Sequence, residues 1–320
     1  MSDAAGLKVI FVAGAGRSGS TLLDRLLGTA PGVCAVGELR QIWRLGFRDD
    51  AYCGCGERFR GCPFWREVVT RAFGSFDAVD GAARYREQEQ LIRVRNAMRL
   101  AWPRRLPTAL RVAAARWRAD HTRLLAAVAE TAGATTIVDS TKNPMYGLLL
   151  ASMEGVDMRT VHLVRDSRAV AYSWAERLKY EPTEDSAQPL FKLRPHRDAA
   201  RWWTFANLGT ELAPPLHRHY RRVFYEDFAA RPASELAALC RFAGIPEVQP
   251  LPGSSTEFDF GGVHHSIGGN PVRFQKGAVT IRADEEWRTA LARGPRRQVT
   301  AYTFPLLLGY GYLLGRRGRR

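Results

Sequence analysis

The stretch GAGRSGSTLL, which begins at Gly14 directly after the apolar run LKVIFVA, constrains the fold more than any other part of the chain. Its spacing of Gly14, four residues and Gly19, followed by Ser20 and Thr21, nearly matches the Walker motif, in which a loop between a strand and a helix holds phosphates with backbone N–H groups. Ser20 stands where that motif has lysine. The cation of this loop is instead Arg17, which can meet an anion at the start of the following helix.

Three interpretations of this loop are open at this point. It could be a glycine-rich turn without a ligand, the phosphate loop of a nucleotide kinase or ATPase, or a site for another phosphate compound. Kinase chemistry relies on the lysine and on Mg²⁺, so Ser20 counts against the second interpretation. Asp139, however, ends an apolar run as a Walker B aspartate does, which keeps the kinase alternative open.

Apolar runs with β-branched residues recur along the chain, each followed by a helical pattern or by turn residues. They are LKVIFVAG (7–14), VCAVGE (33–38), TTIVDS (135–140), RTVHLVRD (159–166) and RRVFYEDF (221–228). Strands that alternate with helices predict an α/β fold, here a P-loop-like parallel sheet flanked by helices. Ligands of such sheets lie beyond the carboxyl ends of the strands. The residues that fall there are Arg17, Glu38, Lys142, Arg165 and Tyr225.

The chain has 320 residues, of which 46% are hydrophobic, so it can bury a large core. We expect a single domain over residues 1–320. Between about 50 and 130 the strand–helix alternation gives way to arginine-rich helical segments such as YREQEQLIRVRNAMRLAW. Their apolar positions recur at near-helical spacing. This region is therefore predicted to be a helical insertion beside the site.

The formal charge of +15 points to anionic partners. No nucleic-acid-binding signature is recognisable, so nucleic acid is not an expected partner. The C-terminal run FPLLLGYGYLL is too short to span a membrane, although the trailing RRGRR could contact anionic lipid. The N-terminus lacks the basic start of a secretory signal, which predicts a cytoplasmic protein. The sequence does not indicate an oligomeric state.

Five cysteines are present, at positions 34, 53, 55, 62 and 240, and three of them cluster in YCGCGERFRGCPFW. Zinc normally takes four ligands with C-x2–4-C spacing, and C-x-C followed by one more cysteine fits that pattern poorly. A structural or redox-sensitive loop is therefore favoured over a metal site. Whether Cys53, Cys55 and Cys62 form a disulfide, bind a metal or stay reduced is left open.

A second anion site is predicted in HLVRDSRAVAYSWAER. An apolar strand ends there in Arg165, and a helix begins near Ser167. Ser173 lies eight positions after Arg165, and Arg177 lies four positions further on the same helix face. Two cations and a hydroxyl around a helix start can bind an anion. Taken alone, the segment could equally be a surface helix with solvated arginines.

Together, the two stretches resemble the sulfotransferases that use 3′-phosphoadenosine-5′-phosphosulfate (PAPS), of the carbohydrate and tyrosylprotein type. In that family R-S-G-S/T-T-L holds the 5′-phosphosulfate, and an Arg and a Ser eight apart hold the 3′-phosphate; GRSGSTLL and RDSRAVAYS reproduce both. The resemblance extends through VFYEDFAARPASELAALCRFAGI, HHSIGGNPVRF and a final YGY. It implies that PAPS is the co-substrate, that 3′-phosphoadenosine-5′-phosphate is the product, and that no metal is required.

The resemblance also implies which residues bind PAPS. The expected contacts at the two ends of the ligand are Arg17, Ser18, Gly19, Ser20 and Thr21 for the 5′-phosphosulfate, and Arg165, Ser173 and Arg177 for the 3′-phosphate. Tyr225 in FYED is expected to line the adenine pocket. Arg273 and Lys276 in PVRFQKG resemble the basic segment that closes over the 3′-phosphate, although the family's G-x-x-G-x-x-K signature does not occur in that form.

The predicted catalytic residues are Glu38 in VGELR and Lys142 in VDSTKNP. In the tyrosylprotein branch a glutamate in a similar G-E-x-x-R segment is the base, whereas the segment here is one residue shorter. In the same branch a lysine faces the leaving oxygen, where an ammonium group stabilises negative charge. The structural alternative for Glu38 is an ion pair with Arg40 or Arg17.

The predicted reaction moves a sulfuryl group from PAPS to a hydroxyl, or less often an amine, of a small-molecule, carbohydrate or peptide acceptor that the sequence does not identify. Such a transfer needs positioning and charge stabilisation more than covalent catalysis. His264 or His265 could replace Glu38 as the base. The alternatives are a nucleotide kinase that needs ATP and Mg²⁺, and a non-catalytic basic module whose binding to nucleic acid or lipid depends steeply on salt.

Overall fold

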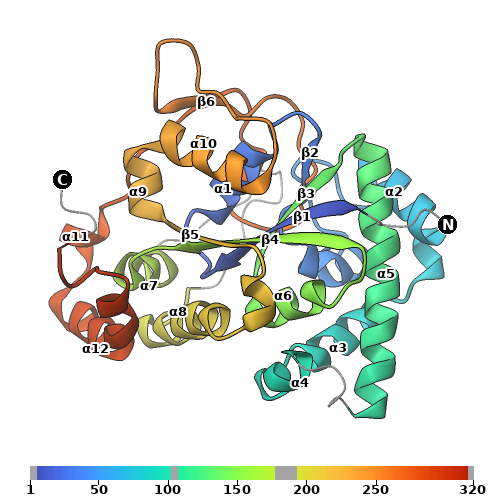
Figure 1. Ribbon diagram of the computed structural model, residues 1–320, viewed down its shortest axis with the longest axis horizontal. Helices are drawn as coiled ribbons and strands as arrows, with labels where there is room; N and C mark the ends of the chain where they lie inside the picture. Colours follow the sequence, from blue (N-terminus) through green and yellow to red (C-terminus); the bar gives the residue numbers. More distant parts are fainter. Residues whose placement is uncertain (1–5, 102–106, 177–192, 316–320) are drawn as a thin grey trace.

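The protein is described here by a computed structural model that covers residues 6–101, 107–176 and 193–315. Its centre is a parallel sheet with the strand order β2-β3-β1-β4-β5 (Figure 1). The strands are β1 (Leu7–Gly14), β2 (Val33–Ala35), β3 (Thr136–Lys142), β4 (Val156–Val164) and β5 (Tyr220–Phe224). Each corresponds to one of the apolar runs in the sequence. The predicted α/β fold with a parallel sheet flanked by helices is confirmed.

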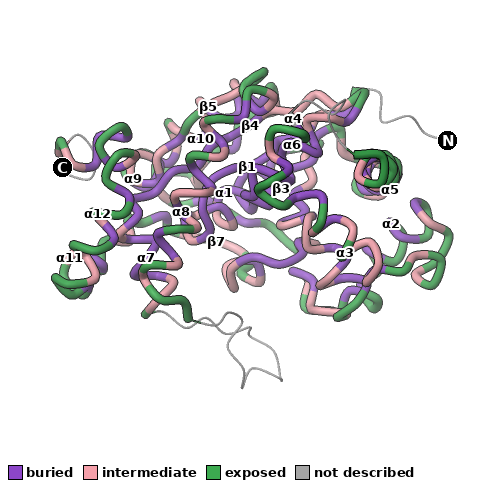
Figure 2. Tube along the Cα trace, turned by 90° about the horizontal axis from the view of Figure 1, so that it is seen from below, coloured by how far each residue is buried: buried purple, intermediate pink, exposed green. Residues whose placement is uncertain are grey.

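The central strand β1 is buried on both faces because its alternate side chains enter different cores. Val9 and Phe11 pack in one core, and Ile10 and Val12 pack in the other. The first core includes side chains of α2 (Pro63–Phe73), α5 (Thr108–Ala132) and α6 (Pro144–Ala151). The second includes side chains of α1 (Ser20–Leu27), α9 (Tyr225–Ala230) and α10 (Pro232–Ala243). Figure 2 shows buried residues gathered along the sheet and exposed residues on the outer turns.

A further group of helices packs near the carboxyl end of β4. They are α7 (Ser167–Ala175), α8 (His196–Glu211) and α12 (Arg293–Gly309), preceded by the short α11 (Trp287–Ala290). Val164 of β4 packs with Trp203 of α8 and Leu307 of α12. Among the described helices, none has both the length and the apolar character needed to cross a lipid bilayer.

The region from about 50 to 130 is helical and contains α2, α3 (Gly81–Leu91), α4 (Ala97–Ala101) and α5. Helices α3 and α5 are joined by an ion pair between Arg84 and Asp120 at 2.6 Å and by a hydrogen bond from Trp117 Nε1 to Gln88 Oε1 at 3.0 Å. Apolar side chains of the region enter the same core as Phe11 of β1. Helix α5 thus packs against the sheet, and α2 and α3 pack against α5.

A long excursion near the C-terminus returns to the carboxyl ends of the strands. It connects β6 (Glu257–Asp259) and β7 (Ala278–Thr280), an antiparallel pair, and includes the 3-10 helix η7 (Pro271–Phe274). Ile267 in this excursion donates its N–H to Val36 O at 2.9 Å and accepts a hydrogen bond from Glu38 N at 2.7 Å. Residues 264–270 are thereby held beside Glu38.

Candidate active site

The loop between β1 and α1 requires glycine at both positions of its Walker-like spacing. Gly14 has φ 121°, and a Cβ atom there would lie 2.2 Å from the carbonyl oxygen of Leu163 in β4. Gly19 has φ 90°, and a Cβ atom there would lie 2.9 Å from the ring of Tyr225. No described side chain caps the start of α1, where Gly19 is the N-cap. The first turn of α1 can therefore offer its N–H groups to an anion.

Arg17 lies within this loop in the left-handed region, at φ 69°, which is unfavourable for a residue other than glycine. Its guanidinium group stacks on the ring of Trp174 at 4.7 Å. Burial lowers the pKa of Arg17 to about 10, although the nearby Glu38 carboxylate raises it. The side chain is thus a desolvated cation at neutral pH, and a bound anion would offset its desolvation.

Arg165, which follows β4, contacts the same loop. Its Nη1 donates to the backbone oxygen of Arg17 at 3.0 Å. Its Nη2 donates to the backbone oxygen of Asp284 at 2.9 Å and lies 3.1 Å from the Asp284 carboxylate. The guanidinium group lies 4.3 Å from the centre of the Tyr225 ring. The two arginines that the sequence assigns to opposite ends of one ligand are therefore neighbours.

The hydroxyl residues of the loop are buried. Ser18 and Ser20 are 1% and 4% exposed. Among the described residues, Ser18 Oγ has no hydrogen-bond partner. Thr21 Oγ1 accepts a hydrogen bond from Asn270 N at 3.1 Å, so the C-terminal excursion also contacts the start of α1. An unpartnered buried hydroxyl is uncommon and is available to a ligand at this loop.

The other residues expected near the 3′-phosphate are only partly placed by the structure. Ser173 is buried on α7, whereas Arg177 lies outside the described residues. Tyr225 begins α9, and its hydroxyl accepts from Asp284 N at 3.2 Å. Its ring is close to both Gly19 and Arg165. Tyr225 therefore connects the two predicted anion sites.

The two residues predicted to be catalytic contact each other. Lys142 Nζ donates to Glu38 Oε1 at 2.8 Å and to Ser140 O at 2.6 Å. Glu38 is thus ion-paired, but with neither of the partners considered from the sequence, since Arg40 binds Glu89 instead. A carboxylate that can take a proton and an ammonium group that can stabilise negative charge therefore lie together at the carboxyl ends of β2 and β3.

Asp24 of α1 lies near the Glu38–Lys142 pair and was not identified from the sequence. It is 1% exposed. Burial raises its pKa to about 7, while the Ser140 hydroxyl and the Lys142 ammonium lower it. The sequence could have indicated Asp24, because it is an acidic residue on the apolar face of the helix STLLDRLL. A fully buried carboxyl beside Lys142, the lysine predicted to be catalytic, makes this region sensitive to pH.

Asp139, the residue in the Walker B position, is held by protein groups. Its Oδ1 accepts from Thr141 Oγ1 at 2.6 Å, from Thr141 N at 3.0 Å and from Leu39 N at 3.4 Å. Burial raises its pKa to about 6, opposed by these hydrogen bonds. Asp139 thus ties the end of β3, which carries Lys142, to the backbone directly after Glu38.

The two histidines considered as alternative bases have different surroundings. The ring nitrogens of His264 are buried and have no hydrogen-bond partner among the described residues. Burial lowers its pKa to about 3, so its ring is neutral at physiological pH. His265 Nδ1 lies 3.2 Å from Cys62 Sγ and 3.7 Å from Cys53 Sγ. His265 therefore faces the loop that carries Cys53, Cys55 and Cys62, which we call the cysteine loop.

The two basic residues of the C-terminal excursion also differ. Arg273 is 2% exposed, and its Nη2 donates to Tyr52 O at 3.3 Å. Its guanidinium group lies 4.5 Å from the centre of the Phe274 ring. Lys276 is exposed. The side chain of Arg273 thus contacts the backbone beside Cys53, whereas that of Lys276 is open to solvent.

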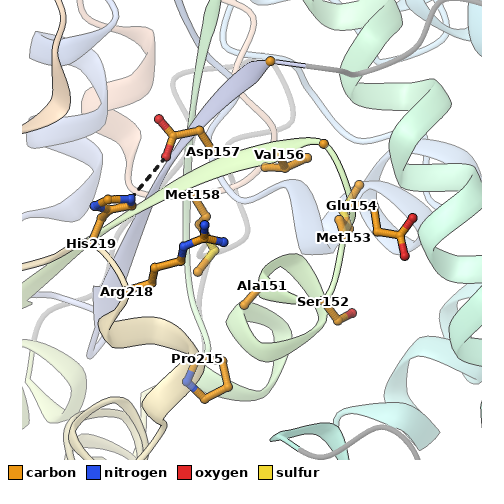
Figure 3. Close-up of a pocket in the computed structure, with 12 residues that line it drawn as sticks. Ala151, Ser152, Met153, Glu154, Val156, Asp157, Met158, Pro215, Arg218 and His219 are labelled. Carbon is orange, nitrogen blue, oxygen red and sulfur yellow. Dashed lines mark ion pairs between the residues drawn. The ribbon is translucent and has the colours of Figure 1, made fainter.

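A cavity of about 590 Å³ lies elsewhere, at the amino ends of β1 and β4 (Figure 3). Its lining includes Gly6, Val156 and Arg218. The one ion pair drawn there joins His219 Nε2 and Asp157 Oδ1 at 3.9 Å. Because the strands are parallel, this cavity is at the opposite edge of the sheet from Arg17 and Glu38. We therefore do not assign the site to it.

Solved structures that are similar to this chain include three sulfotransferases. The sulfotransferase domain of the curacin biosynthetic pathway is 15% identical with a TM-score of 0.47, and the match covers 95% of this chain and 98% of that one. The domain of the Synechococcus PCC 7002 olefin synthase is 19% identical with a TM-score of 0.47, covering 93% and 95%. The sulfotransferase of Alicyclobacillus acidocaldarius is 12% identical with a TM-score of 0.39, covering 97% and 96%.

No curated protein matches the chain. A family model described as "Sulfotransferase family" matches residues 9–250, which is well over half of the sequence. The matched part contains the loop with Arg17, the Glu38–Lys142 pair and Arg165. The chain therefore belongs to the sulfotransferase family.

Proposed function

We propose that the protein transfers the sulfuryl group of PAPS to an acceptor oxygen. The observation that carries this proposal is the contact between Arg165 and the loop of Arg17, at the carboxyl end of the sheet and beside the uncapped start of α1. A half-buried cation, Arg17, and a buried one, Arg165, on adjacent elements suit a ligand with one phosphate at each end of a nucleoside. A nucleoside triphosphate would instead call for the lysine that Ser20 replaces.

The donor contacts follow from this arrangement. Arg17 and the N–H groups of Gly19, Ser20 and Thr21 would hold the 5′-phosphosulfate, with the unpartnered Ser18 hydroxyl close by. Arg165, with Ser173 and Arg177, would hold the 3′-phosphate after exchanging its ion pair with Asp284 for the phosphate. Tyr225 would pack against the adenosine. The side chain of Arg273 contacts Tyr52. We therefore propose that Arg273 supports the segment that closes over the 3′-phosphate and does not itself bind the phosphate.

The transfer itself needs one proton acceptor and stabilisation of negative charge. The acceptor oxygen attacks sulfur, its proton passes to the Glu38 carboxylate, and the bond between sulfur and the 5′-phosphate oxygen breaks. Lys142 and Arg17 stabilise the negative charge that develops on the transferred group and on the leaving phosphate. None of these steps calls on a metal ion.

The acceptor would enter from the side of the helical insertion. Gln88 of α3 donates through Nε2 to Arg40 O at 2.9 Å, and Glu89 pairs with the Arg40 side chain. Arg40 is two residues from Glu38, so α3 lies beside the proposed base. We propose that helices between about 50 and 130 shape the pocket for a small-molecule, carbohydrate or peptide hydroxyl.

Thermal stabilisation by 3′-phosphoadenosine-5′-phosphate tests the donor site. A ligand that binds only the folded chain at a concentration 100 times its Kd adds about 2.7 kcal/mol to the free energy of unfolding. We expect this stabilisation with 3′-phosphoadenosine-5′-phosphate and a much smaller one with 5′-AMP or ADP. Arg165→Ala should abolish it, and Arg165→Lys should restore it in part.

Arg218→Ala is the matched control, since Arg218 is an exposed arginine at the opposite edge of the sheet. It should respond to the ligand as the wild type does. An equal response of the wild type to 5′-AMP would exclude the 3′-phosphate site. Sulfate transfer that proceeds without Mg²⁺ would in turn exclude the kinase.

A further inference from the structure

Three cysteines and one histidine from distant parts of the chain meet outside the proposed active site. Their side-chain ligand atoms all lie within 4.8 Å of one another. Cys55 Sγ is 3.7 Å from Cys62 Sγ, and His265 Nδ1 is 3.2 Å from Cys62 Sγ and 3.7 Å from Cys53 Sγ. The histidine is the fourth member that the spacing of the cysteines in the sequence did not supply.

The three shorter separations, from 3.2 to 3.7 Å, are close to the edges of a tetrahedral metal site. Zinc–sulfur bonds of about 2.3 Å and zinc–nitrogen bonds of about 2.0 Å place neighbouring sulfur atoms about 3.8 Å apart, and sulfur and nitrogen about 3.5 Å apart. A disulfide would instead bring two sulfur atoms to about 2.05 Å, and all five cysteines are free. The four groups are thus spaced to share an ion.

We propose that Cys53, Cys55, Cys62 and His265 bind one zinc ion. Three thiolates and an imidazole are a ligand set that zinc prefers, and four protein ligands leave no open position for a substrate. The site is therefore structural. The spacing of the cysteines favours a structural or redox-sensitive loop and leaves a metal site open; this proposal selects the metal site.

The backbone of the loop turns the cysteines toward one point. Cys53 N donates to Glu57 O at 2.8 Å, and Gly56 N donates to Cys53 O at 3.0 Å. Gly56, at φ 97°, supplies the turn after Cys55. Cys62 is the N-cap residue of α2, where a helix N-terminus favours the thiolate that zinc requires. Each cysteine is thus positioned by local structure.

The histidine is positioned by contacts with the same loop. Its ring stacks on Phe64 with a centroid distance of 4.7 Å and an interplanar angle of 8°. Its backbone oxygen accepts from Trp65 Nε1 at 3.1 Å. Gly54 N donates to Ser266 O at 3.0 Å, and a Cβ atom on Gly54 would lie 2.7 Å from Ser266 Oγ. The Nδ1 of His265 is therefore held toward the three sulfur atoms.

The ion would tie two segments of the chain together beside the proposed base. Cys53 forms a β-bridge with Ile267, and Ile267 O accepts from Glu38 N at 2.7 Å. Zinc bound by Cys53 and His265 would thus fix the segment on which Glu38 rests. Because metal content is measured without any substrate, this proposal stands or falls independently of the donor and the acceptor.

Metal analysis of the full-length chain, purified without a metal-affinity resin, tests the site. We expect one zinc per chain by plasma mass spectrometry. Cys55→Ser and His265→Gln should each lose most of it, whereas Cys34→Ser, which changes a half-buried cysteine in β2, should keep it. Replacement of zinc by Co²⁺ should give the visible absorption of a tetrahedral thiolate complex in the wild type and in Cys34→Ser only.

A second measurement uses no substitution at the cluster and so does not depend on whether the variants fold. A strong chelator should lower the melting temperature of the wild type, and one equivalent of zinc should restore it. The proposal is overturned if metal-free wild-type chain melts at the same temperature with and without zinc. Iron in place of zinc, or a disulfide between Cys55 and Cys62 found by mass spectrometry, overturns it equally.

Discussion

Glu38 and Lys142 are the residues at which proton transfer and charge stabilisation would meet. Among the described residues, only Oε1 of Glu38 has a hydrogen-bond partner, which is Lys142 Nζ at 2.8 Å. In the proposed reaction, the other carboxylate oxygen would accept the proton of the acceptor hydroxyl. Lys142 is held at φ 70°, an unfavourable conformation for a lysine, which points to a specific need for its position.

Glu38→Gln should therefore impair catalysis more than binding. An amide can still accept a hydrogen bond from Lys142 but cannot take a proton, so we expect kcat to fall by about 10²–10⁴-fold, with little change in the affinity for 3′-phosphoadenosine-5′-phosphate. Transfer from radiolabelled PAPS to a panel of phenolic, sugar and tyrosyl-peptide acceptors measures this. Glu154→Gln, at the opposite edge of the sheet, is the control. A wild-type kcat in Glu38→Gln would place the base elsewhere.

Asp24 should make stability depend on pH. Burial raises its pKa to about 7, whereas an unfolded aspartate titrates near about 3.9. Between these two values the folded chain keeps a proton that the unfolded chain releases, so the free energy of unfolding falls as the pH rises from about 4 to about 7. In Asp24→Asn this contribution to the pH dependence of the free energy of unfolding disappears.

Melting temperatures measured between pH 5 and pH 8 check this sign. The advantage of Asp24→Asn over the wild type should grow as the pH rises. Asp77→Asn, which changes a carboxylate with a 95% exposed side chain, should leave the slope unchanged. If the melting temperatures of Asp24→Asn and the wild type changed in parallel with pH, the pKa of Asp24 would not be raised in the folded chain.

At the scale of elements, the sequence predicts the strands well and their ends less well. The run VCAVGE extends to Glu38, but β2 ends at Ala35, and the backbone beyond it is shared between β3 and Ile267 of the C-terminal excursion. Similarly, RRVFYEDF extends to 228, but β5 ends at Phe224, because Tyr225 begins α9. Local propensity finds the apolar run, whereas tertiary contacts decide where it leaves the sheet.

The start of α1 provides a prediction for an element. In Gly19→Ala the new Cβ atom would take up an unfavourable positive φ and would also meet the Tyr225 ring at 2.9 Å. Gly74 has φ 84° with no atom within 4 Å of its Cβ position, so Gly74→Ala bears only the conformational cost, about 1–2 kcal/mol. Gly19→Ala should be destabilised more than Gly74→Ala and should alone lose affinity for 3′-phosphoadenosine-5′-phosphate.

Chemical denaturation and ligand titration of both variants test this comparison. Equal destabilisation, with binding retained in both, would mean that Tyr225 moves aside freely and does not couple the loop to Arg165. That result would remove Tyr225 from the proposed adenosine site.

At the scale of the whole molecule, the sequence predicts those parts of the site that lie at strand ends. Arg17, Glu38, Lys142 and Arg165 each lie at the end of an apolar run or a few residues beyond it, and parallel strands bring such positions to one edge. The fourth member of the cysteine cluster could not be predicted in this way. His265 is about 200 residues from Cys62, and only the folded excursion places it there.

The charge of the whole chain provides the last prediction. A net charge of +15 attracts any polyanion through exposed arginines, and such binding to duplex DNA should weaken by on the order of 10³-fold between about 50 mM and about 200 mM salt. The proposed donor site differs, because the Arg165 side chain is only 6% exposed and Arg17 is desolvated. Salt screens exposed charges beyond about 8 Å at physiological ionic strength and buried ones much less. Stabilisation by 3′-phosphoadenosine-5′-phosphate should therefore persist at a salt concentration that releases labelled DNA in an anisotropy assay, and an equally steep loss of both would favour a basic binding module over an enzyme.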